Sequence, residues 1–214
     1  MAEEVSKTQL DRLGDRLRKG DISEADLRLL DQFRRSFFDA YEKVVGMIRQ
    51  ELALELTGRP AKSTSSIVEK LRRESIRLTQ LQDIAGCRLI VPSIVEQDNV
   101  VQALAKLFER TTIMDRRQQP SHGYRAVHVI VHYGGKMVEI QIRTVLQHFW
   151  AERSEKFSDV LDPAIKYGGG GENVRRILSR LSSAIAEQEL RGTQGVDLQL
   201  VFQLLLKAIG SEKE

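Results

Sequence analysis

The sequence predicts an α+β (α/β-like) protein with one small mixed β-sheet flanked by N- and C-terminal helices. Apolar residues recur every three or four positions before residue 57 and again after Thr144, which is the helical period. Between these regions the period changes to two, and two strand patterns meet at Gly134–Gly135, a pair typical of a β-hairpin. We therefore expect more helix than the third found in an average protein.

The N-terminal helical pattern covers the first 56 residues and is clearest from Leu29 to Ile48. Asp21 and Ser23 are candidate N-caps, and Gly58 to Pro60 marks the end of the stretch. A second helix is predicted over Ile67–Ser75, because Ser66 and Glu69 have the spacing of a capping box.

The remaining elements follow from similar patterns. A short apolar run bounded by Gly and Pro predicts a buried strand, and strict alternation predicts the hairpin. The predicted strands are Cys87–Val91, Thr111–Arg116, Tyr124–Tyr133 and Met137–Arg143; the predicted helices are Glu96–Phe108, Thr144–Phe157, Glu172–Leu190 and Asp197–Ile209, with a flexible loop at Gly168–Gly171.

These elements favour one structural domain made of three segments. Residues 1–57 form helices that pack on the core, residues 58–160 form the core, and residues 161–214 add C-terminal helices. A chain of 214 residues is long enough for one sizeable domain of this kind.

Composition and charge exclude several classes of protein. No run approaches 18 apolar residues, so no membrane span is expected, and the N-terminus has no apolar signal segment. The single cysteine, Cys87, lies in an apolar run, which favours a reducing compartment such as the cytoplasm. A net charge of +3 permits an anionic substrate but is not the dense basic stripe of a typical nucleic-acid binder.

The predicted hairpin separates its side chains into two sets. Glu139, Gln141 and Arg143 alternate with apolar residues and so share one face. Tyr124 and His128 share a face of the partner strand. This polar face is either the solvent side of an antiparallel sheet or the wall of a binding site.

Two carboxylates stand where a metal could bind. Asp83 precedes the first predicted core strand, and Glu139 lies on the polar face of the hairpin. Mg²⁺ favours one or two carboxylates together with substrate phosphates. The alternative is that both residues are surface charges.

A hydroxyl-rich turn enters the helix predicted after residue 66. Lys62 precedes it, and Ser66 and Lys70 are four residues apart and therefore on one helix face. A helix N-terminus flanked by cations can hold phosphate, although the spacing is not that of a Walker A motif. The alternative is an ordinary capped helix with a solvated basic face.

Taken together, these motifs resemble the synthetase domain of the RelA/SpoT alarmone family, in order and approximate spacing, over about residues 58–158. The matching motifs are Lys62-x-x-x-Ser66-Ile-x-x-Lys70-Leu, Asp83-Ile-Ala-Gly-x-Arg88, Gly123-Tyr124-Arg125-x-x-His128, Glu139-Ile-Gln141-Ile-Arg143-Thr144 and Trp150-Ala. The resemblance implies a fold related to nucleotidyltransferases and a single-domain small alarmone synthetase, which transfers pyrophosphate from ATP to the ribose 3′-hydroxyl of GDP or GTP.

The resemblance also implies a role for each motif. Asp83 and Glu139 would be catalytic and hold Mg²⁺, with Glu139 alternatively the general base. Tyr124 would stack on the acceptor base, with His128 near its phosphates. Trp150 and Phe149 are expected in the core. The residues expected to bind ATP are Arg59, Lys62, Ser66, Lys70, Arg88, Gln141 and Arg143.

Two departures from the family pattern bear on the substrates. Pro60 stands where family members commonly have an arginine, and Arg59 lies one residue earlier. Before Gly123, the usual Tyr and Pro-Lys pair is replaced by a segment in which Arg116 and Arg117 would supply the positive charge for the acceptor. This segment leaves acceptor identity open among GDP, GTP, adenine nucleotides and tRNA.

Three functions therefore compete. The first is a GDP/GTP pyrophosphokinase that makes (p)ppGpp. The second is a toxin-type enzyme that modifies the tRNA 3′ end or adenine nucleotides, with a neighbouring antitoxin protein as partner. The third is an inactive nucleotide- or partner-binding module, which the presence of both Asp83 and Glu139 argues against. A homo-oligomer is expected from the resemblance.

Overall fold

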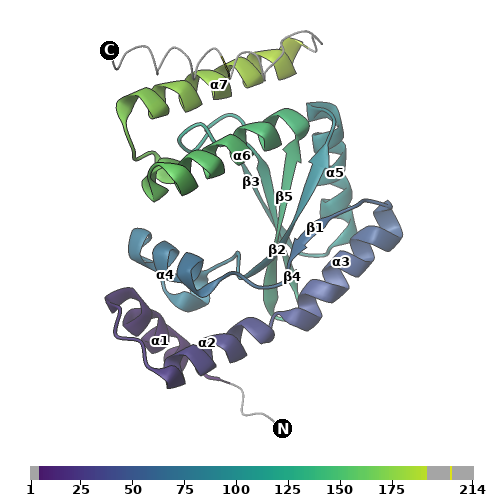
Figure 1. The fold of residues 1–214 in the computed structure, drawn as a ribbon. Coiled ribbons are helices and arrows are strands. Elements are labelled where there is room, and N and C mark those ends of the chain that lie inside the picture. Colours follow the sequence, from purple (N-terminus) through teal and green to yellow (C-terminus); the bar gives the residue numbers. More distant parts are fainter. Residues whose placement is uncertain (1–4, 192–202, 204–214) are drawn as a thin grey trace. The chain divides into compact units, whose positions relative to one another are not determined.

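The computed structural model describes residues 5–191 and Gln203 (Figure 1). The chain divides into two compact units. The first unit comprises residues 1–89, 102–113 and 129–141, and the second comprises residues 90–101, 114–128 and 142–214. The three-segment division expected from the sequence stays a prediction. No helix in the described part of the chain is long and apolar enough to cross a membrane.

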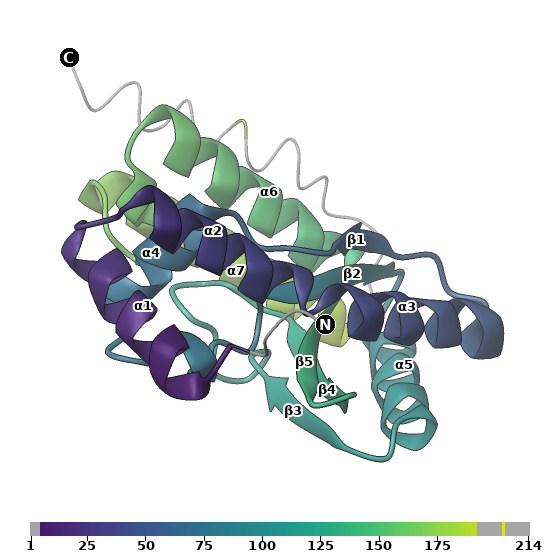
Figure 2. The ribbon, with the colours of Figure 1, turned by 90° about the horizontal axis from the view of Figure 1, so that it is seen from below.

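Three helices occupy the N-terminal region in place of one long helical stretch: α1 (Lys7–Lys19), α2 (Glu24–Arg35) and α3 (Phe38–Leu52). Ser23 is the N-cap of α2, as predicted, and its hydroxyl accepts a hydrogen bond from the Asp26 amide. The α2 helix ends where the Ser36 hydroxyl donates to the Phe33 carbonyl at 2.7 Å. Helix α1 lies beside α2 and α4 (Thr64–Arg73) in both views (Figures 1 and 2).

The α4 helix begins earlier than the sequence predicted. Its N-cap is Ser63, whose hydroxyl accepts from the Ser66 amide at 3.2 Å. The predicted capping box that begins at Ser66 is therefore wrong, because Ser66 already lies in the first helical turn. Several consecutive hydroxyl residues each satisfied the capping pattern, and the sequence alone did not distinguish them.

The five strands are β1 (Thr57–Arg59), β2 (Ala85–Val91), β3 (Thr111–Asp115), β4 (Val127–Tyr133) and β5 (Lys136–Thr144), in the order β1-β2-β5-β4-β3. The sequence analysis missed β1, which pairs antiparallel with β2 and places Gly58 opposite Cys87. Three residues are too few to show alternation, and Gly58 and Pro60 have the appearance of a helix terminator. Gly58 is needed here, because a Cβ would lie 1.8 Å from the Tyr41 hydroxyl of α3.

The predicted hairpin of β4 and β5 is confirmed. Gly134 and Gly135 have φ values of 54° and 75°, and such positive values at both central residues are those that a type I′ turn requires. However, the polar face is not a solvent face: His128, Glu139 and Arg143 are 8%, 7% and 4% exposed. Tyr124 also lies before β4, in a turn where its backbone pairs with that of Ser121.

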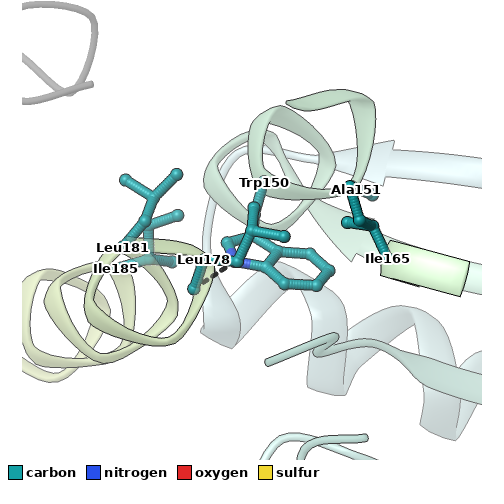
Figure 3. Packing of buried hydrophobic residues seen from close by; sticks show 6 residues of the cluster. All are labelled: Trp150, Ala151, Ile165, Leu178, Leu181 and Ile185. Atoms are coloured by element: carbon teal, nitrogen blue, oxygen red, sulfur yellow. Dashed lines mark hydrogen bonds between the residues drawn. The ribbon is translucent and has the colours of Figure 1, made fainter. Parts of the chain in front are cut away.

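The remaining helices are α5 (Ile94–Leu107), α6 (Val145–Val160) and α7 (Glu172–Arg191), with short 3-10 helices η1 (Leu78–Gln80) and η2 (Pro163–Tyr167). The Trp150 indole packs against α7 in the core of the second unit, as predicted, and donates to the Leu178 carbonyl at 2.7 Å (Figure 3). Gly168, at the start of the predicted loop, has a φ of 81° and ends η2. The predicted helix Asp197–Ile209 lies outside the described residues.

Candidate functional site

Asp83 lies at the centre of a charged cluster in the first unit. Its Oδ2 atom is 2.6 Å from the Lys62 Nζ and 3.1 Å from the Lys70 Nζ. Its Oδ1 atom is buried and accepts no hydrogen bond from any residue that the structure describes. A buried carboxylate oxygen normally has a partner, so this atom is a candidate for a ligand contact.

The environment of the cluster shifts two pKa values. Burial alone would raise the pKa of Asp83, but the nearby Lys70 and Lys62 ammonium groups hold it below its usual value. Burial lowers the pKa of Lys62, and the adjacent Asp83 carboxylate only partly opposes this shift. A phosphate group entering here would find two cations that are already partly desolvated.

Backbone contacts bring the lysine-bearing loop to Asp83. The Lys62 amide donates to the Ile84 carbonyl at 2.7 Å, which holds the loop beside the start of β2. The Arg34 guanidinium of α2 donates to the Lys62 carbonyl and to the Thr64 hydroxyl, each at 3.3 Å. The sequence analysis did not select Arg34, because its positioning contact is a backbone one with no motif to mark it.

Glu139 lies on β5 where that strand passes Gly86. A Cβ at Gly86 would be 2.7 Å from the Glu139 carbonyl oxygen and 3.4 Å from the Glu139 Cβ. The glycine of the Asp83-Ile-Ala-Gly motif therefore permits close approach of the two strands. The Glu139 Oε2 atom accepts from the Gln141 Nε2 at 2.8 Å. Burial and the Glu139 charge raise the pKa of the Cys87 thiol to about 12, so Cys87 remains a thiol.

Two further residues expected at ATP share a face of the sheet. Arg88 is opposite Thr57, and Arg59 is opposite Gly86, so Arg59 and Arg88 lie on the same face of the β1–β2 pair. The Arg59 Nη2 also donates to the Asp83 carbonyl at 3.4 Å. Arg59 therefore contacts the Asp83 backbone from its own position beside Pro60, and its role at ATP stays a prediction.

Ser66 lies at the N-terminal end of α4, and Lys70 lies one turn further along the helix. The Ser66 hydroxyl accepts from the Ser63 hydroxyl at 2.8 Å. The first unit thus contains the predicted catalytic residues and all the predicted ATP-binding residues except Arg143: Arg59, Lys62, Ser66, Lys70, Asp83, Arg88, Glu139 and Gln141. We call the group formed by Lys62, Lys70 and Asp83 the Asp83 cluster.

A second cluster, formed by Tyr124, His128 and Arg143, lies in the second unit. The Tyr124 hydroxyl is 2.9 Å from the His128 Nε2 and accepts from the Arg143 Nη2 at 3.1 Å. The Arg143 guanidinium carbon is 5.0 Å from the centre of the Tyr124 ring. We call this group the Tyr124 cluster; it presents rings and a guanidinium, which suit a flat base.

Gly123 fixes the position of Tyr124. It has a φ of 92°, which favours glycine, and a Cβ would lie 2.7 Å from the Trp150 Cζ2. The Tyr124 and Trp150 rings are 6.4 Å apart. The structure therefore joins the Gly-Tyr motif to the Trp150 core, a contact that sequence spacing did not reveal.

The two arginines expected at the acceptor differ in their contacts. The Arg117 guanidinium donates to Asp115 at 2.6 Å and to Asp98 at 2.7 Å, so two carboxylates balance its charge. The Arg116 amide donates to the Ala126 carbonyl at 2.9 Å. A role for either arginine in acceptor binding stays a prediction.

The residues fit a magnesium ion that binds mainly through substrate phosphates. The residues that the structure describes include no group of three potential ligands from His, Cys, Asp and Glu. A site made only of protein ligands is therefore not expected among them. The unpartnered Asp83 Oδ1 is a hard oxygen atom of the type that Mg²⁺ prefers.

Comparison with known proteins agrees with the motifs. Residues 58–157 match the region found in RelA and SpoT proteins. GTP pyrophosphokinase YjbM of Bacillus subtilis is 32% identical over 177 residues, which cover 74% of this chain and 80% of that protein. An uncharacterised protein of Mycobacterium tuberculosis is 36% identical over 133 residues, or 60% of this chain; this chain covers only about half of its length, 48%.

A solved structure extends the similarity to three dimensions. Small alarmone synthetase 1 of Bacillus subtilis, bound to its product pppGpp, superposes with a TM-score of 0.56 at 27% identity, covering 79% of this chain and 95% of that one. Small alarmone synthetase 2 of the same organism gives the same score over 88% of this chain and 98% of that one, again at 27% identity. The expected α+β fold with a small mixed sheet is confirmed, and the sheet has five strands. By its sequence and its fold, the chain belongs to the RelA/SpoT family.

Proposed function

We propose that this chain is an ATP:nucleotide 3′-pyrophosphokinase that transfers pyrophosphate from ATP to the ribose 3′-hydroxyl of GDP or GTP. The observation that carries this proposal is the Asp83 cluster: a buried carboxylate with one unpartnered oxygen between two lysine ammonium groups. This arrangement suits a polyphosphate and its metal ion, which bring charges of both signs.

ATP would bind through residues of the first unit. Lys62 and Lys70 would leave their direct contacts with Asp83 and bind phosphate oxygens, with Ser66 at the N-terminal end of α4 as a further donor. Arg59 and Arg88 would hold the adenine from one sheet face, because planar guanidinium groups stack on rings. Asp83 and Glu139 would hold Mg²⁺, which supplies charge neutralisation at the phosphates when it is bound.

In the proposed reaction, the acceptor 3′-hydroxyl oxygen attacks the β-phosphorus of ATP. A new oxygen–phosphorus bond forms, the bond from the β-phosphorus to the α,β-bridging oxygen breaks, and AMP leaves. We assign the hydroxyl proton to the Glu139 carboxylate as general base. Charge develops on phosphate oxygens during the transfer, so fixed cations should supply much of the rate enhancement.

The acceptor would bind at the Tyr124 cluster. The Tyr124 ring would stack on the base, with His128 and Arg143 near the phosphates. The Arg143 role differs from the ATP role expected from the sequence, because its donors contact the Tyr124 hydroxyl. The names of YjbM and YwaC, GTP pyrophosphokinases of Bacillus subtilis, support a guanine nucleotide as acceptor.

A toxin-type enzyme acting on tRNA or adenine nucleotides is the second candidate, because the segment before Gly123 departs from the family pattern. The contacts of three arginines weaken the electrostatic argument for this second candidate. Arg117 is paired with two carboxylates, and the Arg72 Nε and Arg73 Nη2 donate to protein oxygen atoms at 3.1 and 2.9 Å. An antitoxin partner would be expected only for this second candidate.

We also propose that the enzyme works in the cytoplasm, where its nucleotides are found, and that it self-associates. Cys87 is a buried free thiol, which suits a reducing compartment. Val160 and Leu190 are 80% and 86% exposed, and contact with a second chain would cover them. Light scattering coupled to size-exclusion chromatography would give the oligomeric state.

The test is a transfer assay with ATP labelled on its γ-phosphate and with Mg²⁺. GDP, GTP, adenine nucleotides and deacylated tRNA are offered separately, and the Glu139→Gln protein serves as the blank. We expect label on GDP or GTP. Label on tRNA or an adenine nucleotide would replace the acceptor assignment, and no transfer to any acceptor would contradict the proposed activity.

A further inference from the structure

The second unit contains a cavity of about 450 Å³ beside the Tyr124 cluster but lined by other residues. Its walls come from the segment around Gly123, from the residues near Gly168 and from one face of α7. A cavity of this size is in the range of small-molecule sites. Its polar lining consists of His122, Arg125, Arg175, Ser179, Ser182 and Ser183.

The charged residues that line the cavity are all basic. Two arginines contribute to the lining, and none of the residues found to line the cavity is an acid. The Arg175 guanidinium and the Ser179 and Ser183 hydroxyl groups make no side-chain hydrogen bond or ion pair within the part of the chain that the structure describes. Arg125 is held in place, because its Nε donates to the buried Ser182 hydroxyl at 3.1 Å and its Nη1 donates to the Arg117 carbonyl.

Part of the cavity wall is apolar. Ile165 and Leu178 line it, and both belong to the core around Trp150 (Figure 3). The His122 ring covers Gly168, where a Cβ would lie 2.0 Å from the His122 Cδ2. His122 itself has a φ of 54°, which is uncommon for a residue other than glycine and is found often at ligand sites.

We propose that this cavity binds a small phosphate-bearing molecule, with Arg175 and Arg125 as the cations and Ser179 and Ser183 as hydroxyl donors. A phosphate group accepts from several donors at once and matches a guanidinium in geometry. The apolar wall would contact the remainder of the ligand. This site is separate from the ATP and acceptor sites proposed above, and binding to it does not depend on the proposed reaction.

The intrinsic fluorescence of Trp150 can report binding at this site. Trp150 is the only tryptophan in the sequence, and it contacts two residues of the cavity wall. Its indole donates to the Leu178 carbonyl at 2.7 Å, and its ring leaves no space for a Cβ on Gly123. Occupation of the cavity should therefore change Trp150 fluorescence.

The experiment is a titration of Trp150 fluorescence with inorganic pyrophosphate, without ATP and at constant ionic strength. Arg175→Glu is the test variant, and Arg180→Glu is the matched control, because Arg180 is also exposed on α7 but does not line the cavity. We expect saturable binding to the wild type, at least ten-fold weaker binding to Arg175→Glu and unchanged binding to Arg180→Glu. Thermal melting of both variants checks that they are folded.

The proposal is overturned if the wild type shows no saturable change, or if the two arginine variants lose affinity equally, since that would indicate general charge attraction. Lys70→Ala, which alters the Asp83 cluster, should titrate like the wild type; a loss equal to that of Arg175→Glu would assign the signal to the ATP site. Titration with GDP, carried out on the wild type and on Arg175→Glu, identifies the source of the phosphate. Because Tyr124 of the proposed acceptor site is 6.4 Å from Trp150, only the part of the GDP signal that Arg175→Glu loses is assigned to the cavity. Tighter binding of GDP than of pyrophosphate indicates a nucleotide, and equal binding indicates the phosphate group alone.

Discussion

The Asp83 cluster and the Tyr124 cluster are both compact polar groups, but different forces hold them together. Asp83 is held by charge, with two ammonium groups within 3.1 Å of one carboxylate oxygen. Tyr124 is held by ring packing, by a hydrogen bond between its hydroxyl and the His128 ring, and by a hydrogen bond that its hydroxyl accepts from Arg143. The first cluster leaves a buried acceptor atom without a partner, whereas the second centres on an aromatic ring.

This difference corresponds to the two ligands of the proposed reaction. A triphosphate with its metal ion needs paired charges that can exchange partners, and a purine base needs a flat surface. Changes in the first cluster should therefore affect turnover most, whereas changes in the second should affect the apparent affinity for the acceptor.

The largest effect is expected for Asp83→Asn. It removes the carboxylate that we assign to the metal and leaves the Lys62 and Lys70 ammonium groups without their counter-charge. Turnover should fall by about 10³-fold or more. Stability should fall by about 3 kcal/mol, because the lysines stay largely buried. Steady-state kinetics and chemical denaturation measure the two effects.

The difference in stability between the wild type and Asp83→Asn should also depend on pH. The lysines lower the pKa of Asp83 below its ordinary value of 3.8, so the ionised carboxylate stabilises the fold above that value. This contribution is lost as the pH falls through the lowered pKa, and the two proteins should then converge in stability. Asp15→Asn, at an exposed acid paired only with Arg18, is the control and should keep full turnover. An Asp83→Asn enzyme with wild-type turnover would contradict the assignment.

Glu139→Gln should lower turnover by about 10²- to 10⁴-fold, the range for loss of a general base. The side chain is buried and the substitution is nearly isosteric, so we expect a melting temperature close to that of the wild type. ATP affinity should change little, because Asp83 and the two lysines remain to hold the ATP phosphates and their metal ion. A large loss of ATP affinity at unchanged turnover would instead make Glu139 a binding residue.

Tyr124→Ala should raise the KM for the acceptor by about 5- to 150-fold, since stacking on an aromatic ring contributes about 1–3 kcal/mol. The KM for ATP should remain within two-fold. Tyr124→Phe keeps the ring but loses the hydrogen bonds with His128 and Arg143, and we expect a smaller effect. An equal effect of the two substitutions would assign the function to the hydroxyl rather than to the ring.

Two glycines are also needed for close packing, Gly86 beside Glu139 and Gly123 beside Trp150. Gly86→Ala should cost about 1–3 kcal/mol because its Cβ would meet the Glu139 backbone at 2.7 Å. Gly123→Ala should cost more, since its Cβ would meet Trp150 and its φ of 92° is also unfavourable for alanine. Gly46→Ala, inside α3 with no atom within 4 Å of the added Cβ, should stabilise the protein by about 0.5–1 kcal/mol. Denaturant melts should find Gly123→Ala the least stable, Gly86→Ala next and Gly46→Ala more stable than the wild type.

The smallest effect is expected at Cys87. Burial and the Glu139 charge raise its pKa to about 12, so no thiolate absorbance should appear up to pH 10. In Glu139→Gln the negative charge is gone and the pKa should decrease. A Cys87 that ionises near pH 8 in the wild type would contradict the burial of its thiol beside Glu139.

The sequence predicted four of the five strands and all six residues of the two clusters, because strong alternation and family motifs mark them. It did not predict which residues contact each other. Lys62 reaches Asp83 through a backbone bond to Ile84, and Arg34 supports the same loop from α2. These contacts join residues 20 or more positions apart, and no local period records them.

Other features were missed for local reasons. Strand β1 is three residues long and contains Gly58, whose need for space comes from Tyr41 of another helix. Arg117 was expected at the acceptor because of its charge, but Asp98, which pairs with it, is 19 residues away in the sequence. Alternation correctly grouped Glu139, Gln141 and Arg143 but did not show that this face is largely buried.

The most direct test of the two-cluster account is calorimetric binding, in the presence of Mg²⁺, of a non-hydrolysable ATP analogue and of GDP to Lys70→Ala and Tyr124→Ala. The account predicts a crossed pattern: Lys70→Ala binds the ATP analogue at least ten-fold more weakly and keeps its GDP affinity, whereas Tyr124→Ala shows the reverse. If both variants lose the same ligand, or if each loses both ligands equally, the assignment of ATP to the Asp83 cluster and of the acceptor to the Tyr124 cluster is wrong.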